Sequence, residues 1–253
     1  MLIRWNELTK DQFEQYRDRA TVAINIASTE QHSQHLPVGT DAIIGEAVLE
    51  VAAQLATSPI LLLPQICYGY SPHHRFAPGY VTISQNTLVS YTRDLCRSVL
   101  ENGFKRMFLV NSHGGNQAFL SSVVNEIGEQ YGESFSLMEL RYWDVAGSRI
   151  MAIRDSALGG AAHAGEFETS MIMYLRPELV QADKIAECSP AKGDPWFQMD
   201  LLGQKKYLKY SNFNSYNPDG HIGQPHLASA EKGKLFFEAT TEELAAFFDY
   251  FSV

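Results

Sequence analysis

The sequence is poor in cysteine. Its three cysteines, Cys67, Cys96 and Cys188, are far apart and form no CxxC pair. Neither a disulfide framework nor a thiolate zinc site is therefore expected. Free thiols are typical of proteins in a reducing compartment, so the predicted location is the cytoplasm.

Long apolar runs and an excess of positive charge are also missing. No apolar run approaches the roughly 18 residues of a membrane helix, and the N-terminus lacks the apolar core of a signal peptide. The formal net charge is −9. A nucleic-acid-binding protein needs a basic face to neutralise phosphates, so neither nucleic acid nor a membrane is an expected partner. An anionic small substrate stays open, because a metal ion can reverse the local charge.

Three common catalytic motifs are absent. The chain contains no GxxxxGK[ST] sequence, no GxGxxG after a strand and no GxSxG elbow. Their absence disfavours phosphoryl transfer, redox chemistry with a dinucleotide, and serine hydrolysis.

Strand-like and helical patterns alternate along the chain, with no visible linker or repeat. Short apolar runs bounded by turn residues are typical of strands that are covered on both faces. Four such runs are predicted as strands: 21–28, 60–64, 106–112 and 134–140. The predicted helices are 40–56 with Thr40 as N-cap, 84–103 ending at Gly103, one starting near Gly115, one starting near Gly165, and 231–251. We expect one domain over residues 1–253, of the α/β class, with a mostly parallel sheet between helix layers.

The stretch STEQHSQHLPVGTD, residues 28–41, follows the first predicted strand. The site of an open parallel sheet lies beyond the carboxyl ends of its strands. Glu30 and His32 are two residues apart, so both project to one side of an extended segment. Asp41 falls in the first turn of the next helix. Carboxylate and imidazole ligands suit zinc, manganese or iron, whereas the alternative is a polar loop with a capping aspartate.

The stretch LVNSHGGNQAFL, residues 109–120, runs from a strand into a helix. His113 is interpreted as a further metal ligand, with a hydrogen-bonded loop histidine as the alternative. The adjacent Gly114 and Gly115 allow close approach of the backbone, and their amides can hold an oxyanion.

The stretch AAHAGEFETSMIMYLRP, residues 161–177, opens another helix. His163 is the candidate proton shuttle. Glu166 is interpreted as a partner of the helix dipole. Glu168 is predicted to be a ligand of a second metal or a general base. Two long loops, 68–80 and 210–233, could border the pocket, and a solvated role is equally consistent with the His73-His74-Arg75 segment.

These segments together resemble the creatininase (creatinine amidohydrolase) family. STEQHSQHLPVGTD is similar to the family box S-T-E-Q-H-G-P-H-L-P-x-G-T-D, and NSHGGN to N-G-H-G-G-N. HAGEFETS resembles H-[AG]-G-x-x-E-T-S. HIGQPHLASAEKG resembles G-x-x-G-D-P-x-x-A-[TS]-x-E-K-G, and HHRFAPGYVTIS resembles E-H-x-x-F-P-G-T-x-S. The boxes occur in the family's order from about residue 21 to 233.

The resemblance implies a three-layer α/β/α sandwich, two divalent metal ions and a homo-oligomer, often a hexamer. Zinc is the first expectation, with manganese or iron as alternatives. By position, Glu30 and His113 would bind one ion, His32 the other, and Asp41 both. His163 matches a catalytic histidine of the family.

The chain departs from true creatininases at several positions. Gly115 replaces a glutamate that completes their second metal site, so Glu168 is predicted to serve instead. Ala162 replaces a glutamate before the catalytic histidine, Gln224 replaces an aspartate, and Tyr80 replaces a threonine. These changes argue against creatinine itself as the substrate.

The predicted function is therefore a metal-dependent amidohydrolase acting on a small cyclic amide or a formamide. One alternative is the same metal centre acting on a C–O or C–C bond of an oxidised sugar or cyclitol ring. The other is a non-catalytic, metal-stabilised binding subunit. Four positions are predicted to contact the substrate: Gly114, Gly115, His74 and Tyr80.

Overall fold

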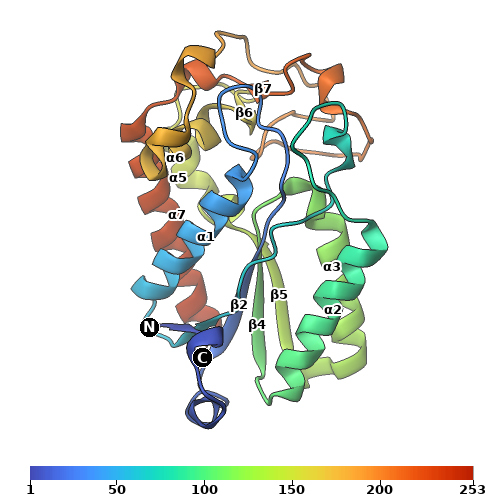
Figure 1. The fold of residues 1–253 in the computed structure, drawn as a ribbon, viewed down its shortest axis with the longest axis vertical. Helices are drawn as coiled ribbons and strands as arrows, with labels where there is room; N and C mark the ends of the chain where they lie inside the picture. The colour runs from blue at the N-terminus through green and yellow to red at the C-terminus, as the bar shows by residue number, and fades with distance from the viewer. Residues whose placement is uncertain (253) are drawn as a thin grey trace.

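The computed structural model describes residues 1–252. Its centre is a five-stranded sheet in the order β1-β3-β2-β4-β5, and every neighbouring pair is parallel (Figure 1). The strands are β1 (Leu2–Arg4), β2 (Thr21–Ile26), β3 (Ile60–Leu62), β4 (Arg106–Asn111) and β5 (Ser136–Arg141). The predicted parallel sheet is confirmed.

Helices cover both faces of this sheet (Figure 1). One layer contains α1 (Thr40–Leu55), α4 (Tyr142–Val145), α5 (Gly147–Ile153), α6 (Glu166–Leu175) and α7 (Ala230–Phe251). The other contains α2 (Gln85–Glu101) and α3 (Gln117–Tyr131). The predicted three-layer α/β/α sandwich is therefore confirmed. Among the described helices, none is both long and apolar enough to cross a membrane.

The sheet separates two hydrophobic clusters. On β4, Phe108 packs into the cluster shared with α1, α6 and α7, whereas Met107 and Leu109 pack into the cluster shared with α2 and α3. This alternation follows from the two-residue period of a strand. All six residues of β2 are buried, which explains its continuous apolar sequence.

The element boundaries differ from the predicted ones in ways that have local causes. Strand 60–64 ends at Leu62, before Pro64. Thr40 was predicted to cap α1, but it is the first helical residue, and its hydroxyl donates to the Pro37 carbonyl at 2.7 Å. Strand β1 was not predicted, because three residues are too few to show a period.

A small antiparallel pair lies beyond the carboxyl edge of the main sheet (Figure 1). It consists of β6 (Ala161–His163) and β7 (Ile222–Gly223), and neither strand was predicted. Loops connect this pair to the helices, and together they cover the end of the sheet where β2 and β4 finish. Polar side chains that follow those strands are thereby enclosed.

Gly233 allows close packing of α7 against α6. A Cβ at this position would lie 1.9 Å from the carbonyl oxygen of Ser170. We predict that Gly233→Ala lowers the free energy of unfolding by about 3 kcal/mol, because the two helices must move apart. Gly128, exposed on α3 with no atom near its would-be Cβ, is the matched control. Gly128→Ala should raise stability by about 1 kcal/mol in the same urea titration. Equal stability of the two variants would contradict this packing account.

Candidate metal centre

The predicted ligands meet at the carboxyl edge of the sheet. Glu30 and His32 follow β2, His113 follows β4, and Asp41 lies in the first turn of α1. Glu168 comes from the first turn of α6. All five side chains are buried or nearly so, and four of them, all except His32, line a cavity of about 450 Å³.

Glu30 is the centre of the first group of donors. Its Oε2 lies 3.2 Å from Nδ1 of His113, and its Oε1 lies 3.2 Å from Nε2 of His74. Nδ1 of His163 lies 3.7 Å from the same Oε1. Burial favours the protonated acid, but the neighbouring charges of His113 and His74 outweigh it and hold the pKa of Glu30 well below its usual value.

Asp41 faces two histidines with its two oxygens. Oδ1 lies 3.1 Å from Nε2 of His32, and Oδ2 lies 3.1 Å from Nδ1 of His113. Glu168 approaches the same His32 nitrogen at 3.8 Å. Asp41 therefore belongs to two groups of three donors, one with Glu30 and His113 and one with His32 and Glu168.

Unsatisfied buried atoms show that these donors fit a metal. Oε2 of Glu30, Nε2 of His32 and Oδ2 of Asp41 are buried and have no aligned hydrogen-bond partner among the described residues. They stand close to other donors without the geometry of a hydrogen bond. Two ligands bound at about 2.1 Å to a tetrahedral ion are about 3.4 Å apart, which is close to the spacing seen here. An orphaned buried polar atom is costly, so the arrangement calls for cations.

The charges of the cluster perturb both groups of donors. Burial opposes protonation of His32, but Asp41 outweighs it and raises the pKa of His32 to about 9. Burial and the charge of Asp41 raise the pKa of Glu168 to about 7, although His32 acts in the opposite direction. Metal ligands must be deprotonated, so binding of an ion here releases protons.

A glycine fixes the orientation of His113. Its Nε2 donates to the carbonyl oxygen of Tyr70 at 3.1 Å, which leaves Nδ1 free to face Glu30 and Asp41. A Cβ on Gly115 would lie 2.4 Å from this ring. The missing side chain at position 115 therefore makes room for the His113 ring and its hydrogen bond. Both Gly115 and Gly114 line the cavity, and their contact with a substrate stays a prediction.

His163 lies beside the donors at the cavity wall. Its Nε2 donates to the carbonyl oxygen of Gln31 at 2.8 Å, so Nδ1 is the nitrogen that faces Glu30. Burial and the charges of His32 and His74 hold its pKa well below the usual value. The ring is therefore neutral and can accept a proton at Nδ1.

Two predicted substrate contacts lie elsewhere. His74 is fully buried; it accepts a hydrogen bond from the Gln31 amide at 2.8 Å and faces Glu30, so it supports a ligand from behind. Tyr80 is half-buried and does not line the cavity. The contact of Tyr80 with a substrate stays a prediction, and its position outside the cavity lining does not support it.

Glu166, interpreted as a dipole partner, accepts a hydrogen bond from the backbone of Asp155 and pairs with Lys232.

Several residues of the site were not predicted. Gln31 connects His74 and His163, but a glutamine between two histidines has no pattern that signals such a role. A buried ion pair of Arg154 with Asp200, at 2.9 Å, anchors the segment 194–216, which forms another part of the cavity wall. No periodicity in that segment reveals its position.

Comparisons with known proteins identify the family of the chain. The family model described as "Creatininase: Creatinine amidohydrolase" matches residues 6–248. A mycofactocin precursor peptide peptidase of Mycobacterium ulcerans is 28% identical over 88% of this chain and 82% of its own length. The creatinine amidohydrolase of Pseudomonas putida is 25% identical over 87% and 85%.

Further similarity comes from a cyclitol enzyme and from a solved structure. The 3-dehydro-scyllo-inosose hydrolase of Thermotoga maritima is 25% identical over 88% of this chain and 75% of its own. A structure described as "Creatininase Mn" superimposes with a TM-score of 0.82 at 23% identity, covering 99% of this chain and 98% of that one. The chain belongs to the creatininase family, and the prediction of a metal-dependent hydrolase of this family is confirmed.

The two glutamates of the first turn of α6 provide a matched test of the second donor group. Glu168→Gln should reduce the bound metal from about two equivalents per chain to about one, because it removes a donor from the group of His32 and Asp41. Glu166→Gln should keep both ions but lower the melting temperature, since Lys232 loses its buried partner and keeps only the exposed Asp155. Elemental analysis of the purified variants measures the first effect. Two ions in Glu168→Gln would exclude Glu168 as a ligand.

Proposed function

We propose that the protein uses two divalent metal ions to hydrolyse a small cyclic amide or a formamide. The observation that carries this proposal is the sharing of Asp41 by two buried groups of donors. Glu30, Asp41 and His113 would hold one ion, and His32, Asp41 and Glu168 the other. Three carboxylates and two neutral imidazoles in a buried site balance most of the charge of two divalent ions.

Zinc is the first choice for these ions, with manganese or iron as alternatives. The donors are nitrogen and oxygen atoms only, a set that suits all three metals. Solved creatininases are described as a manganese form and a "Zn-Zn type". Those descriptions support the choice of metals without deciding between them here.

Divalent ions in such a site lower the pKa of water towards neutrality and polarise a carbonyl group. The protein supplies the remaining functions. His163, with Nδ1 free, accepts a proton and passes it to the leaving nitrogen. The backbone amides of Gly114 and Gly115 border the position where negative charge develops. Trp143 and Phe213 line the cavity and exclude water around the reacting group.

A second candidate is hydrolysis in an oxidised cyclitol or sugar ring. The similarity to the Thermotoga maritima hydrolase favours it, because that relative carries a carbocyclic substrate in its name. A non-catalytic binding subunit is less favoured, since Glu168 lies close enough to His32 and Asp41 to supply the carboxylate that Gly115 cannot. Assembly into a homo-oligomer such as a hexamer, and a location in the cytoplasm, stay predictions from the sequence.

The test is hydrolysis of a panel of cyclic amides, formamides and oxidised cyclitols by metal-loaded protein. We predict that at least one amide releases its amine, that a chelator abolishes this release, and that zinc or manganese restores it. His163→Asn should lower kcat about 100-fold or more while metal content is unchanged, because proton transfer is lost and no proposed ligand is altered.

His226→Asn is the control, since His226 does not line the cavity. It should keep wild-type kcat. Turnover that survives complete removal of metal would contradict the proposal. Release of a ring-opened acid without an amine would instead select the second candidate.

A further inference from the structure

The cavity continues beyond the metal centre towards a group of basic side chains. Arg141, at the end of β5, lines it together with Lys205 and Lys209. The carboxylates of the lining are the three proposed metal ligands and one further residue, Asp200. Asp200 is already neutralised by Arg154 at 2.9 Å. Away from the metals, the cavity wall is therefore positive.

Arg141 is held in a fixed orientation. Its Nη1 donates to Oε1 of Gln117 at 2.9 Å, and its Nη2 pairs with Asp144. Asp144 balances one positive charge, and the two lysines are left in excess. A guanidinium held by two partners is preorganised to meet a planar anion.

Lys205 forms no ion pair, although the carboxylates of Asp144 and Asp200 act on its charge from a greater distance. Within residues 1–252, no carboxylate lies in ion-pair distance of its Nζ, which is 6.0 Å from the centre of the Phe197 ring. Desolvation and the nearby charge of Arg141 lower the pKa of Lys205, although Asp144 and Asp200 act in the opposite direction. An anion bound beside Lys205 would favour its charged form and so offset the lowering. In a protein with a net charge of −9, such a local excess of cations is unexpected.

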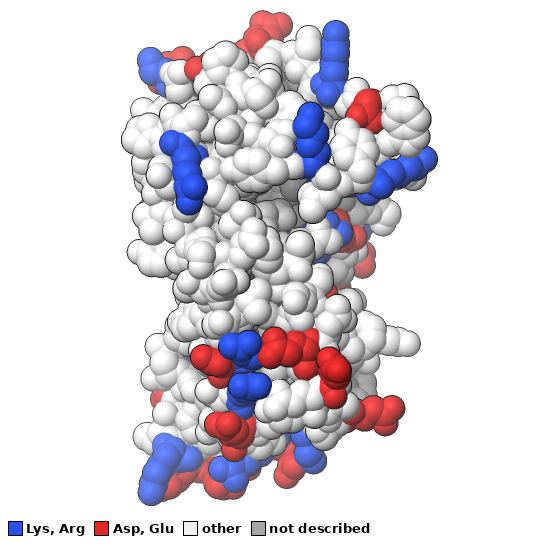
Figure 2. Space-filling view, turned by 90° about the vertical axis from the view of Figure 1, so that its right-hand side faces the viewer, with Lys and Arg blue, Asp and Glu red and all other residues white. Residues whose placement is uncertain are grey.

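The surface agrees with this distribution of charge. In the upper half of Figure 2, several Lys and Arg side chains and few Asp or Glu lie around a hollow, whereas both kinds of charge are interspersed in the lower part of this face. A positive opening in an acidic protein attracts anionic ligands and disfavours cationic ones.

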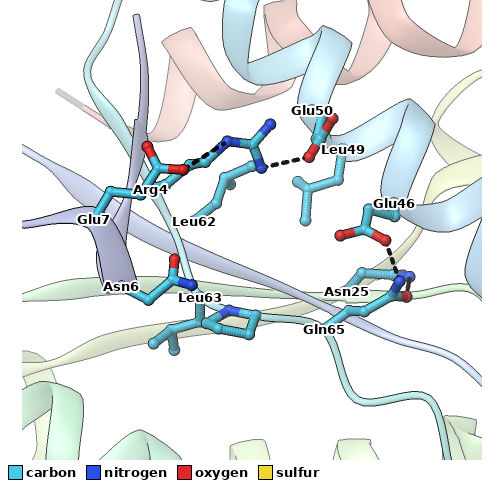
Figure 3. A pocket seen from close by; sticks show the side chains of 11 residues that line it. Arg4, Asn6, Glu7, Asn25, Glu46, Leu49, Glu50, Leu62, Leu63 and Gln65 are labelled. Carbon is cyan, nitrogen blue, oxygen red and sulfur yellow. Dashed lines mark hydrogen bonds and ion pairs between the residues drawn. The ribbon is translucent and has the colours of Figure 1, made fainter.

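A second hollow of the molecule, beside β1 and α1, shows the opposite situation (Figure 3). There Arg4 pairs with Glu50 at 2.5 Å and with Glu7 at 3.8 Å, and Glu46 accepts a hydrogen bond from Gln65. The cation is neutralised within the protein. At the metal cavity, by contrast, the charge of Lys205 is not neutralised by an ion pair within the described residues.

We propose that the substrate carries an anionic group, a carboxylate or a phosphate, that pairs with Lys205 and Arg141 while its scissile amide lies at the metal donors. This inference rests on the proposed function. It narrows the substrate from small amides in general to small amides with an acidic end. Lys209, which also lines the cavity, adds to the electrostatic attraction of the anionic substrate.

The test compares N-formyl amino acids with their carboxamides and with formylated aminoalkyl phosphates. Wild-type, metal-loaded protein should show a kcat/KM about tenfold higher for one of the acidic series than for the neutral carboxamides. If the N-formyl amino acids show the larger ratio, the preferred anion is a carboxylate. If the formylated aminoalkyl phosphates show it, the preferred anion is a phosphate. Lys205→Met should reduce this ratio towards one, Lys205→Arg should retain most of it, and the exposed Lys234→Met on α7 should leave it unchanged. Melting temperatures establish that each variant is folded.

A preference for the neutral carboxamides, or a ratio that Lys205→Met leaves intact, would overturn the inference while the proposed function stands. If no compound of this panel is hydrolysed, the formamide half of the proposed function fails, and titration calorimetry with the same acids and carboxamides still decides the inference. Tighter binding of an acid that Lys205→Met abolishes would support it. Equal binding of acid and carboxamide would refute it.

Discussion

The mutual repulsion of three buried carboxylates is the constraint on which the site depends. Glu30, Asp41 and Glu168 lie among histidines at the end of the sheet, and little of their side-chain surface is exposed. Burial raises the pKa of Glu168 to about 7, and the charge of Asp41 acts in the same direction. Such a cluster is stable only when cations enter it. The histidines can supply protons, but two divalent ions compensate the charge more completely and match the spacing of the donors.

The fold brings these side chains together from distant parts of the chain. In a parallel sheet the carboxyl ends of neighbouring strands meet at one edge, so the residues after β2 and β4 become neighbours. The end of β6 adds His163, and the first turn of α6 adds Glu168. His113 and His163 then donate hydrogen bonds to the backbone carbonyls of Tyr70 and Gln31, which fixes the orientation of both rings. The tautomers of both histidines are thereby set by the protein.

The parts that the sequence could predict are those with a periodic or compact pattern. Apolar runs predict four of the five strands of the sheet, because strands covered on both faces have continuous hydrophobic sequences. Glu30, His32 and Asp41 could be found because they lie within one short stretch. Glu168 could be named as the substitute ligand because Gly115 has no side chain and a carboxylate had to come from elsewhere.

The parts that it could not predict depend on long-range contacts. His74 lies in a loop with aromatic and proline residues that suggests an exposed rim, yet the loop folds inward and buries the ring against Glu30. Lys205 belongs to a segment without periodicity, whose position is set by the distant pair of Arg154 and Asp200. No local pattern connects residue 205 with the metal site, and the same is true of Gln31 as a link between two histidines.

The shared aspartate is the most direct point at which to test this account. Elemental analysis of untagged wild-type protein should find about two equivalents of zinc, manganese or iron per chain, one for each donor group. The same measurement on Asp41→Asn should find almost none, because both groups lose a charged donor and Asn offers only a neutral oxygen. Full metal content in Asp41→Asn, or no metal in wild-type protein even after it is added back, would contradict the central claim.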